Sequence, residues 1–410
     1  MPHPAYTFPP ELERCIESLL HGLKAAGVAR SVAELSAFFT SHRRARPGNY
    51  LADPESRAAY IAYFLPANYS KLHAVFEEMK PLLVEHFEQV ARERPNDQRA
   101  FRVLDVGAGP GTMTLAALEY LHALSPHGAF QFSAVDPNRE MLKICRQLFH
   151  CLRDRIGIKE GQAGLKTHVA SLQGLFSRPA AHAGPGSPFD IIILANVWNE
   201  LEDSGPMSLP AQVSLIRGLL DQLGDHGALI LIEPALRESS RTIHQLHDAV
   251  LEQIEGANVF APCVHQGLCP CVAAGNEKDW CHTEFAWQPT GQITAIDRII
   301  GNRKDALKFS YLVLRKDGKN VLDLNPLSMG CEGQSASWRV VSELIVEKGK
   351  RRAYLCGEPG RFQFTRLDRH ESPANRVFGD LNRGDIVRIS GAESRNEDWR
   401  LSDATAVERI

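Results

Sequence analysis

A group of glycines follows an acidic residue at the end of an apolar stretch, and this group could bind a ligand. Residues 102–106 are apolar and β-branched enough to form a buried strand. Glycines directly after a strand let the backbone turn tightly and approach a ligand closely. We therefore predict a ligand-binding loop, whose residues of interest are Asp105, Gly107, Gly109 and Gly111.

Two further residues favour S-adenosylmethionine over a dinucleotide as the ligand of this loop. The next predicted strand ends in Asp136, whose carboxylate could accept hydrogen bonds from both hydroxyls of a ribose. Pro110 removes one backbone N–H from the loop, which makes the loop a poor cradle for phosphate. An acidic residue before the glycines is also typical of methyltransferases. A glycine-rich turn without a ligand is the alternative.

A third polar group lies at the end of the fourth predicted strand, in the stretch Asn196–Leu201. Ligands of open α/β sheets bind outside the carboxyl ends of the strands, so we expect Asn196 to face the reactive sulfonium. The stretch contains no nucleophile and lacks the Asn/Asp-Pro-Pro-aromatic sequence common in enzymes that methylate amino groups of DNA. Glu200 either joins the site or caps the next helix, and Glu233 is another candidate acid. The catalytic residues therefore remain unknown from the sequence.

The cysteines provide a second candidate site. The chain has nine cysteines, and four of them, Cys263, Cys269, Cys271 and Cys281, fall within nineteen residues. An odd count in a long chain without an export signal argues against a disulfide framework. We therefore expect a metal site in this segment. The thiols of Cys15, Cys145 and Cys151, which lie on predicted helices, are expected to be inert.

The cysteine spacing favours a four-thiolate iron–sulfur cluster over zinc. Zinc sites use paired cysteines separated by two to four residues, and no pair here matches that spacing cleanly. Irregularly spaced thiolates, one followed by proline, suit a cluster better. If three ligands come from this segment, Cys356 is the natural fourth, because it ends a predicted strand beside a glycine-rich turn. Cys331 is the alternative fourth ligand, and zinc or no metal remain alternatives.

A doubly wound α/β sheet must position the glycine loop. Between about 101 and 240, short apolar strands alternate with helical segments, which is the pattern of a parallel sheet with Rossmann-like topology. A Pro/Gly/Ser-rich loop from Arg178 to Pro188 precedes the fourth strand. The predicted strands are residues 102–106, 130–135, 166–170, 190–194 and 228–232.

The two ends of the chain have different patterns. Residues 1–100 are predicted to be helical, with helices over Glu11–Ala26, after Asp53 and from Ser70 to Phe87, and with a break at Pro66. Residues 241–262 are predicted to form another helix, and Lys308–Arg315 a strand. After about 335 the chain is rich in strands, which predicts a small antiparallel, barrel-like domain. The predicted domains are 1–100 (helical), 101–260 (S-adenosylmethionine-binding), 261–334 (cysteine-rich) and 335–410 (β).

Composition excludes several classes of protein. The chain has 46 Lys and Arg against 49 Asp and Glu, a net charge of −3, so it is not a polycationic nucleic-acid binder. No run of eighteen apolar residues indicates a membrane helix, and we expect no signal peptide. Local basic segments could still meet phosphates. Residues 298–319 hold seven basic residues against the acids Asp297, Asp305 and Asp317, and residues 348–352 add four basic ones. His42–Arg46 is a further basic patch or a solvated turn.

Taken together, these motifs resemble one family closely: the methyltransferase-like assembly proteins of the small ribosomal subunit, known in mitochondria and also found in bacteria. The resemblance extends over most of the chain and depends on several separate motifs. The matching stretches are Tyr60–Tyr69, Val103–Gly111, Asn199–Leu201, Glu233-Pro234, Cys263–His265, Cys269-Pro270, Asp279–His282 and Lys308–Leu312.

This resemblance implies a protein that binds S-adenosylmethionine, holds a [4Fe–4S] cluster and contacts small-subunit rRNA. It implies a bacterial cytoplasmic or a mitochondrial matrix location, and nothing in the sequence indicates a membrane or an oligomer. The alternatives are an active rRNA methyltransferase with a structural cluster and a metal-stabilised RNA-binding module with a vestigial pocket. Carried over by position, the cluster ligands are Cys263, Cys269, Cys281 and Cys356, with Cys271 spare.

Overall fold

The computed structural model groups the chain into two compact units. The first, here called the sheet unit, comprises Pro4–Glu233 and Ala286–Leu307; the second, here called the cysteine unit, comprises mainly Pro234–Phe285 and Lys308–Ile410. The four domains predicted from the sequence stay a prediction. The structure describes residues 6–22, 25–40, 51, 53–95, 99–170, 188–198, 207–273, 277–324, 335–395 and 398–410. The predicted basic patch 42–46, most of the 178–188 loop, residues 199–201 and Cys331 lie outside these ranges.

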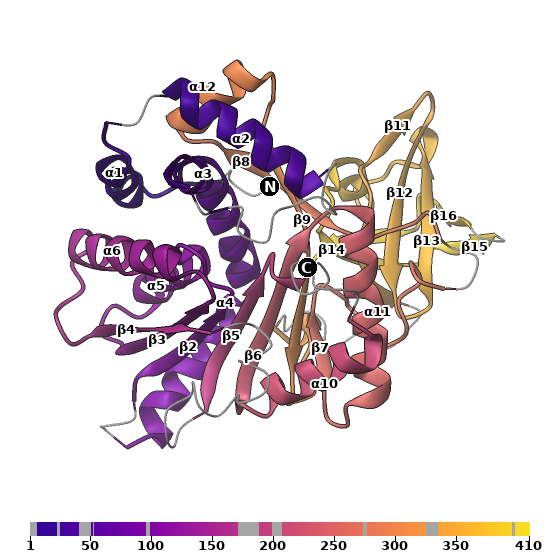
Figure 1. Cartoon of the computed structure of the whole chain (residues 1–410). Helices are drawn as coiled ribbons and strands as arrows, with labels where there is room; N and C mark the ends of the chain where they lie inside the picture. Colours follow the sequence, from indigo (N-terminus) through magenta and orange to yellow (C-terminus); the bar gives the residue numbers. More distant parts are fainter. Residues whose placement is uncertain are drawn as a thin grey trace. The chain divides into compact units, whose positions relative to one another are not determined.

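Five parallel strands form the centre of the sheet unit, in the spatial order β4-β3-β2-β5-β6 (Figure 1). All five strands predicted from the sequence are present, so the doubly wound α/β fold is confirmed. The central strands are almost fully buried, as apolar strands are when helices cover both faces of a parallel sheet. The strands are β2 (Phe101–Val106), β3 (Phe130–Asp136), β4 (Ala163–Val169), β5 (Phe189–Ala195) and β6 (Leu223–Pro234), and the helices between them are α5 (Thr112–Leu124), α6 (Arg139–Arg155) and α10 (Leu209–Leu220).

The N-terminal region is helical, as predicted, but its helix boundaries differ. The first helix ends at Leu19, well before the predicted Ala26. Pro66 does not break the chain's helix: a π-helical turn, Tyr60–Phe64, leads directly into α4, and Pro66 lies in the first turn of α4, where a missing N–H costs little. Among the described residues, no helix is long and apolar enough to cross a membrane. The elements are β1 (Tyr6–Thr7), α1 (Pro10–Leu19), α2 (Ala25–Thr40), α3 (Pro54–Ala59), α4 (Leu65–Glu93) and α12 (Gly291–Ile300).

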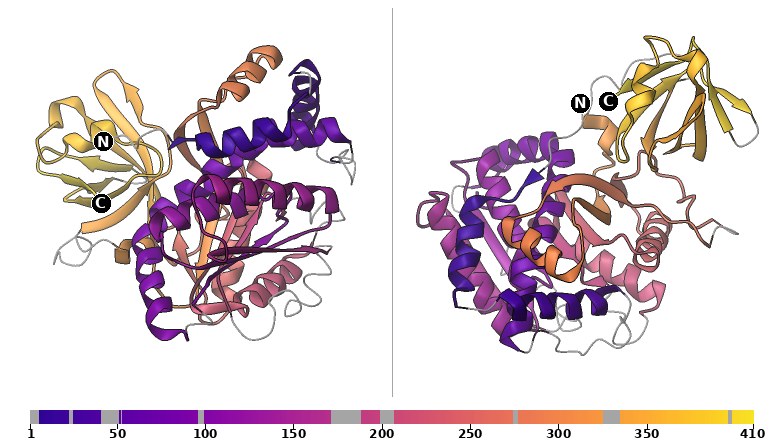
Figure 2. Two further views of the ribbon diagram at one scale, coloured as in Figure 1. Left: turned by 90° about the vertical axis from the view of Figure 1, so that its left-hand side faces the viewer. Right: turned by 90° about the horizontal axis from the view of Figure 1, so that it is seen from above.

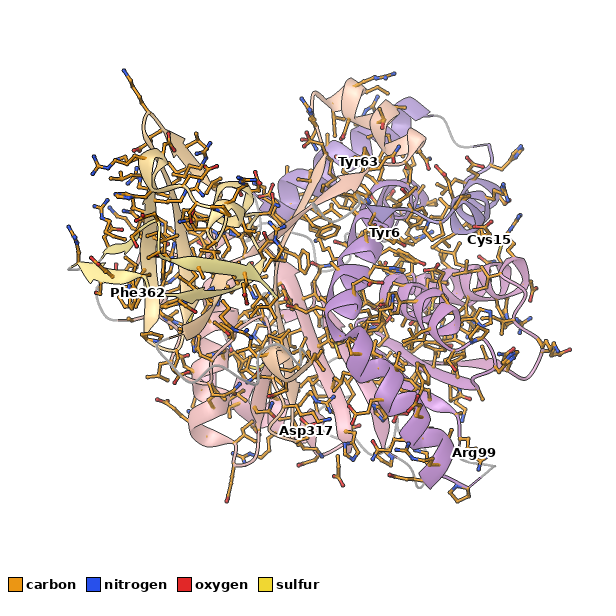
Figure 3. The ribbon with its side chains drawn as sticks, turned by 180° about the vertical axis from the view of Figure 1, so that it is seen from behind. Tyr6, Cys15, Tyr63, Arg99, Asp317 and Phe362 are labelled. Carbon is orange, nitrogen blue, oxygen red and sulfur yellow. A yellow bond between two sulfur atoms is a disulfide. The ribbon has the colours of Figure 1, made fainter. Side chains whose placement is uncertain are left out.

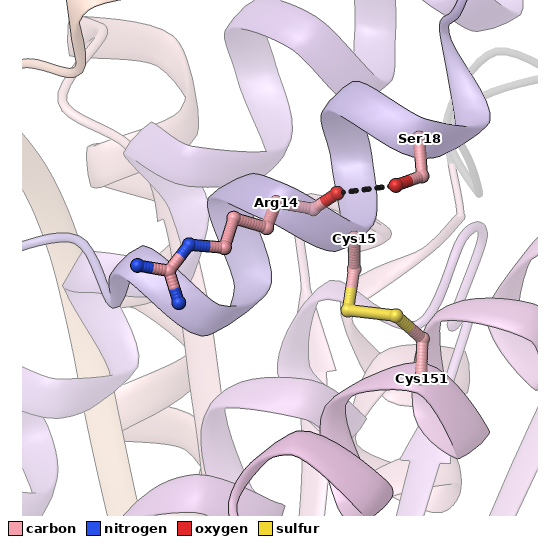
Figure 4. The surroundings of a disulfide bond; sticks show 4 residues. All are labelled: Arg14, Cys15, Ser18 and Cys151. Carbon is pink, nitrogen blue, oxygen red and sulfur yellow. Dashed lines mark hydrogen bonds between the residues drawn. A yellow bond between two sulfur atoms is a disulfide. The ribbon is translucent and has the colours of Figure 1, made fainter.

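One pair of cysteines in the sheet unit departs from the sequence prediction. Cys15 of α1 and Cys151 of α6 form a disulfide, with their Cα atoms 6.0 Å apart (Figure 4). The expectation that both are inert thiols is therefore wrong. The two cysteines are 136 residues apart in the sequence, and only the packing of α1 against α6 brings them together. Cys145, by contrast, is a free and buried thiol, as expected.

The cysteine unit contains a helix, a strand pair and a second sheet. The predicted helix 241–262 is instead α11 (Arg237–Gln253) followed by β7 (Asn258–Ala261), which pairs with β9 (Ala306–Arg315). The second sheet has the order β15-β16-β13-β12-β10-β14-β17 and is antiparallel except for the parallel pair β13–β16. Its strands are drawn in the yellow tones of Figure 2. No pairing among the described residues closes it into a barrel. Its strands are β10 (Ser335–Val340), β11 (Ile345–Glu347), β12 (Lys350–Gly357), β13 (Gly360–Leu367), β14 (Ile386–Ser390), β15 (Glu393–Arg395), β16 (Asp398–Leu401) and β17 (Ala406–Arg409).

Candidate functional site

The glycine loop connects β2 to α5, and its three glycines have different roles. Gly107, Gly109 and Gly111 all have positive φ angles, of 71°, 52° and 86°. A Cβ atom added to Gly107 would collide with Val197, and one added to Gly111 would collide with Cys145. A Cβ atom on Gly109 would meet nothing within 4 Å. Gly107 and Gly111 are therefore required by packing, and Gly109 is the glycine with open space in front of it.

Asp136 closes the neighbouring strand β3 and holds this loop. One carboxylate oxygen accepts the N–H of Gly109 at 2.8 Å, and the other accepts the N–H of Asn138 at 2.7 Å. Burial raises the pKa of Asp136, although both backbone N–H groups favour its ionised form. A carboxylate has further lone pairs, so these bonds leave it able to accept from a ligand. Its predicted contact with a ribose stays a prediction.

Asp105 is directed toward the helix that follows the loop. One of its oxygens accepts both the N–H of Thr114, at 2.9 Å, and the Thr114 hydroxyl, at 2.7 Å. Burial raises the pKa of Asp105 to about 7. The side chain therefore anchors the first turn of α5 beneath the glycine loop. Direct contact between Asp105 and a cofactor remains a prediction.

The ends of β5 and β6 form the next part of this edge. Asn196 follows β5 with a φ angle of 58°, and it alone among the described non-glycine residues has a positive φ. Its N–H donates to the carbonyl of Ile232 at 2.8 Å, and the N–H of Trp198 donates to the Glu233 carboxylate at 2.9 Å. A non-glycine residue in this conformation costs free energy and is typical of functional sites. Asn196 therefore stays a candidate on structural grounds.

The cysteine unit contains a cavity of about 60 Å³, which is several times the space that one water needs (~10–15 Å³). Its wall includes the four predicted ligands, so the structure brings them together from separate segments. Cys271 lines the same cavity, although the sequence predicted that it would not bind the cluster. Whether it is a ligand stays a prediction, as it does for the other four cysteines. The lining cysteines are Cys263, Cys269, Cys271, Cys281 and Cys356.

Histidines that the sequence analysis did not select surround these cysteines. The His265 Nε2 atom lies 3.5 Å from the Cys356 sulfur, and the His244 Nε2 atom accepts the N–H of Cys281 at 3.0 Å. His247 bonds to Asp248 at 2.7 Å and to Cys263. Burial lowers the pKa of His244 to about 4. For His247, burial alone would lower the pKa, but the charges of Cys263 and Asp248 raise it to about 10. The helical spacing of 244 and 247 on α11 was the only sequence signal for this pair.

Two arginines hold the cysteine loop in place. The Arg241 guanidinium donates to the carbonyls of Cys271, at 2.7 Å, and Asp279, at 2.9 Å. Arg361 of β13 forms an ion pair with Asp279 and lies 3.7 Å from the Cys271 sulfur. A hydrogen bond from Cys269 and the charge of Arg361 lower the pKa of Cys271, whereas burial raises that of Cys281 to about 12. The loop is therefore fixed to both α11 and the second sheet.

The described donors give no direct support for a bound metal. Among the described residues, no group of three or more His, Cys, Asp or Glu side chains is arranged to hold a metal ion. Zinc requires four donors directed at one point, so this finding gives it no support. In a four-iron cluster each thiolate binds a different iron, so the sulfurs surround a volume instead of a point. Five cysteines around one cavity are chemically suited to that group.

The predicted basic segments carry less uncompensated charge than their sequence suggested. Lys350 pairs with Glu347 at 2.9 Å, Arg351 with Asp368 at 2.9 Å, and Arg352 with Glu347. In the segment 298–319, Arg303, Lys308 and Arg315 pair with Asp305, Glu284 and Asp317. Glu284 and Asp368 are distant in sequence from the residues that they pair with, whereas Glu347, Asp305 and Asp317 lie two to five residues from their partners. Parts of both segments are therefore ion-paired, and a cationic surface that meets RNA there stays a prediction.

The sheet order and the glycine loop define the class of the sheet unit, a methyltransferase-like α/β fold. The family model described as "Mitochondrial small ribosomal subunit Rsm22" matches residues 54–387. The chain therefore belongs to this family, which confirms the resemblance found in the sequence. A search of curated proteins finds no significant match.

Solved structures similar to the chain are methyltransferases. The ribosomal protein L11 methylase from Lactobacillus delbrueckii subsp. bulgaricus is 16% identical, with 57% of this chain and 77% of that chain covered and a TM-score of 0.26. The plantazolicin methyltransferase BpumL in complex with SAH is 12% identical, with 74% and 99% covered and a TM-score of 0.31. TrmN from Thermus thermophilus is 18% identical, with 58% and 48% covered and a TM-score of 0.29. At such TM-scores these likenesses carry no argument about function.

Proposed function

We propose that this protein is an S-adenosylmethionine-binding, methyltransferase-like factor that associates with the small ribosomal subunit during its assembly. Membership of the Rsm22 family over residues 54–387 carries this proposal. The cofactor part draws support from the open space before Gly109 and from Asp136 at the end of β3. The proposed location is the mitochondrial matrix, or the cytoplasm if the chain is bacterial.

The proposal includes a [4Fe–4S] cluster in the cavity of the cysteine unit. Its ligands would be Cys263, Cys269, Cys281 and Cys356, and such a cluster would join the cysteine loop to β12 of the second sheet. Thiolate ligation contributes to folding free energy, so this cluster would act first as a structural link. Arg361 donates toward the Cys271 sulfur, and His265 lies within hydrogen-bond distance of the Cys356 sulfur, so both would interact with thiolates around such a cluster.

A second candidate function, methyl transfer to rRNA, is favoured by the strained Asn196 at the carboxyl end of β5. Two experiments separate these functions. If lysates sedimented at low salt keep the protein at the top of the gradient while precursor subunits accumulate, ribosomal association is wrong. Mass mapping of small-subunit rRNA then tests catalysis: one methyl mark lost without the protein, and restored by wild type but not by Asp136→Ala, establishes an enzyme.

A further inference from the structure

Buried polar side chains gather beside the ends of β5 and β6, and the glycine loop does not use them. Lys71 of α4 is only 8% exposed, and its amine donates to the side-chain oxygen of Asn68 at 2.8 Å. In the part of the chain that the structure describes, no carboxylate lies within ion-pair distance of this amine. The acid whose charge acts on it is Glu233, at the end of β6. The Lys71 ammonium group has three N–H donors, and the bond to Asn68 uses one of them, so Lys71 can also donate to a ligand.

A second lysine lies next to the first. The Lys304 amine is 4.4 Å from the centre of the Tyr63 ring and 5.6 Å from that of Phe64. The Tyr63 hydroxyl donates to Asp297 at 2.5 Å and accepts from Asn302 at 2.7 Å, which fixes the ring. Figure 3 labels the position of Tyr63 in the chain. Tyr63 belongs to the π-helical turn before α4, and such turns occur frequently at functional sites.

The two amines are held at a cost in free energy. Burial, together with the charge of Lys304, lowers the pKa of Lys71 to about 7, and burial lowers that of Lys304 to about 8. Asp297 offsets part of this cost for Lys304, whereas Lys71 has only Asn68 and the charge of Glu233. Buried amines of this kind are unfavourable, and such strongly shifted groups cluster at functional sites. Lys71 and Lys304 lie side by side, with the carboxylate of Glu233 near Lys71 at the end of β6, and this combination indicates a binding site.

The strand order places this cluster beyond the predicted cofactor. Asp136 ends β3 and the glycine loop follows β2, whereas Glu233 ends β6, which is two strands further along the sheet. Neighbouring strands are about 4.8 Å apart, so Glu233 lies roughly 10 Å across the sheet from the glycine loop. That position is on the side of the methyl group, where a second ligand would approach.

We infer that Lys71 and Glu233, with Lys304 beside them, recognise a nucleobase of RNA at the acceptor side of the cofactor. This inference rests on the proposed function. The hydrogen-bonding edge of a base carries donors and acceptors side by side, which matches one carboxylate next to one ammonium. Glu233 would repel a phosphate at the same position. The half-buried ring of Phe64 provides a nearby aromatic surface, whereas Tyr63 is buried and covered by the Lys304 amine.

Bisubstrate analogues test this site on the full chain. In these compounds nitrogen replaces the sulfur of S-adenosylhomocysteine and carries a three-carbon chain that ends in one of the four RNA bases. Matched compounds end in a methyl group or in a phosphate. We expect calorimetry to show that at least one base-bearing compound binds about tenfold or more tightly than the methyl-ended one, as hydrogen bonds to charged groups allow.

Two variants link that gain to the proposed residues. In Lys71→Met and in Glu233→Gln the gain should fall below about twofold, while affinity for S-adenosylhomocysteine stays unchanged and reports correct folding. Lys143→Met, on the exposed face of α6, is the control and should keep the full gain. If one variant fails to fold, the loss or persistence of the affinity gain in the other variant still tests the inference.

The other outcomes contradict the inference in distinguishable ways. It is overturned if no base improves binding, if the gain persists in both variants, or if the phosphate-ended compound gains most. Absence of binding by S-adenosylhomocysteine to the wild-type protein instead overturns the cofactor proposal, and this inference with it.

Discussion

The glycine loop takes its residues from one short stretch of chain, whereas the cysteine cavity gathers residues 262–265, 269–271 and 281–283, two histidines of α11 and Cys356 of β12. The loop is local in sequence, with three positive φ angles between β2 and α5, although Asp136, Val197 and Cys145 support it from other parts of the sheet unit. The cavity depends on contacts between elements far apart in the sequence. A local motif therefore predicted the glycine loop, whose ligand contacts stay a prediction, whereas the sequence predicted only some of the residues that line the cavity.

The largest expected effect concerns the cavity. Anaerobically purified protein should be brown and hold about four irons per chain, and Cys263→Ser should lose most of that iron. Cys271→Ser is the matched control and should keep its iron if Cys271 is spare. Iron analysis and the visible absorption spectrum provide the measurement. A colourless, zinc-containing wild-type preparation would contradict the cluster, and iron loss in Cys271→Ser alone would exchange the ligand assignment.

The disulfide offers a contrast within the sheet unit. Cys15 and Cys151 enclose a loop of more than a hundred residues, so the disulfide should stabilise the folded unit by about 4 kcal/mol. Urea unfolding of the full chain with and without reductant measures this difference. Cys15→Ser should be insensitive to reductant and match the reduced wild type. Equal stability of oxidised and reduced wild-type protein would show that the link does not form in solution.

Substitutions in the glycine loop separate packing from ligand binding. Gly107→Ala and Gly111→Ala should lower the free energy of unfolding by about 3 kcal/mol, because each adds a collision to an unfavourable backbone conformation. Gly109→Ala should cost only about 1 kcal/mol, yet it should weaken S-adenosylmethionine binding strongly. Gly109→Asn accommodates the positive φ better and tests the same contact. Unchanged calorimetric affinity in both Gly109 variants would rule out this cofactor pose.

The smallest expected effect is a pH dependence of the free energy of unfolding, which we expect from Asp105 beneath the glycine loop. The pKa of Asp105 is about 7 in the folded chain and about 3.8 in the unfolded chain. At pH values between these two, the folded state therefore holds a proton that the unfolded state has lost. The free energy of unfolding should therefore fall as pH rises from 5 to 7.5, with about 2 kcal/mol of that fall due to Asp105.

Asp105→Asn tests this assignment, since its amide oxygen can still accept from Thr114 but does not titrate. Urea unfolding at both pH values should show a fall smaller by that amount in the variant. An identical fall in wild type and variant would mean that the Asp105 carboxyl titrates normally.

The sequence by itself determined the strands, the glycine loop and the cysteine segment, because each depends on residues that are neighbours in the chain. Alternating apolar stretches specify strands, and glycines after a strand specify a turn. The first-turn position of Pro66 escaped this reasoning because the π-helical turn before it has no distinct sequence pattern.

Only the tertiary structure decided which distant residues meet. It joined Cys15 to Cys151, set Asp368 against Arg351, and buried Lys71 beside Glu233. The physical reason is common to all three: burial and charge pairing depend on distances through space, and residues far apart in sequence leave no periodic signal of their contact. The composition gives the number of charged residues, but only the folded structure shows which of the described ones form ion pairs and which, like Lys71, do not.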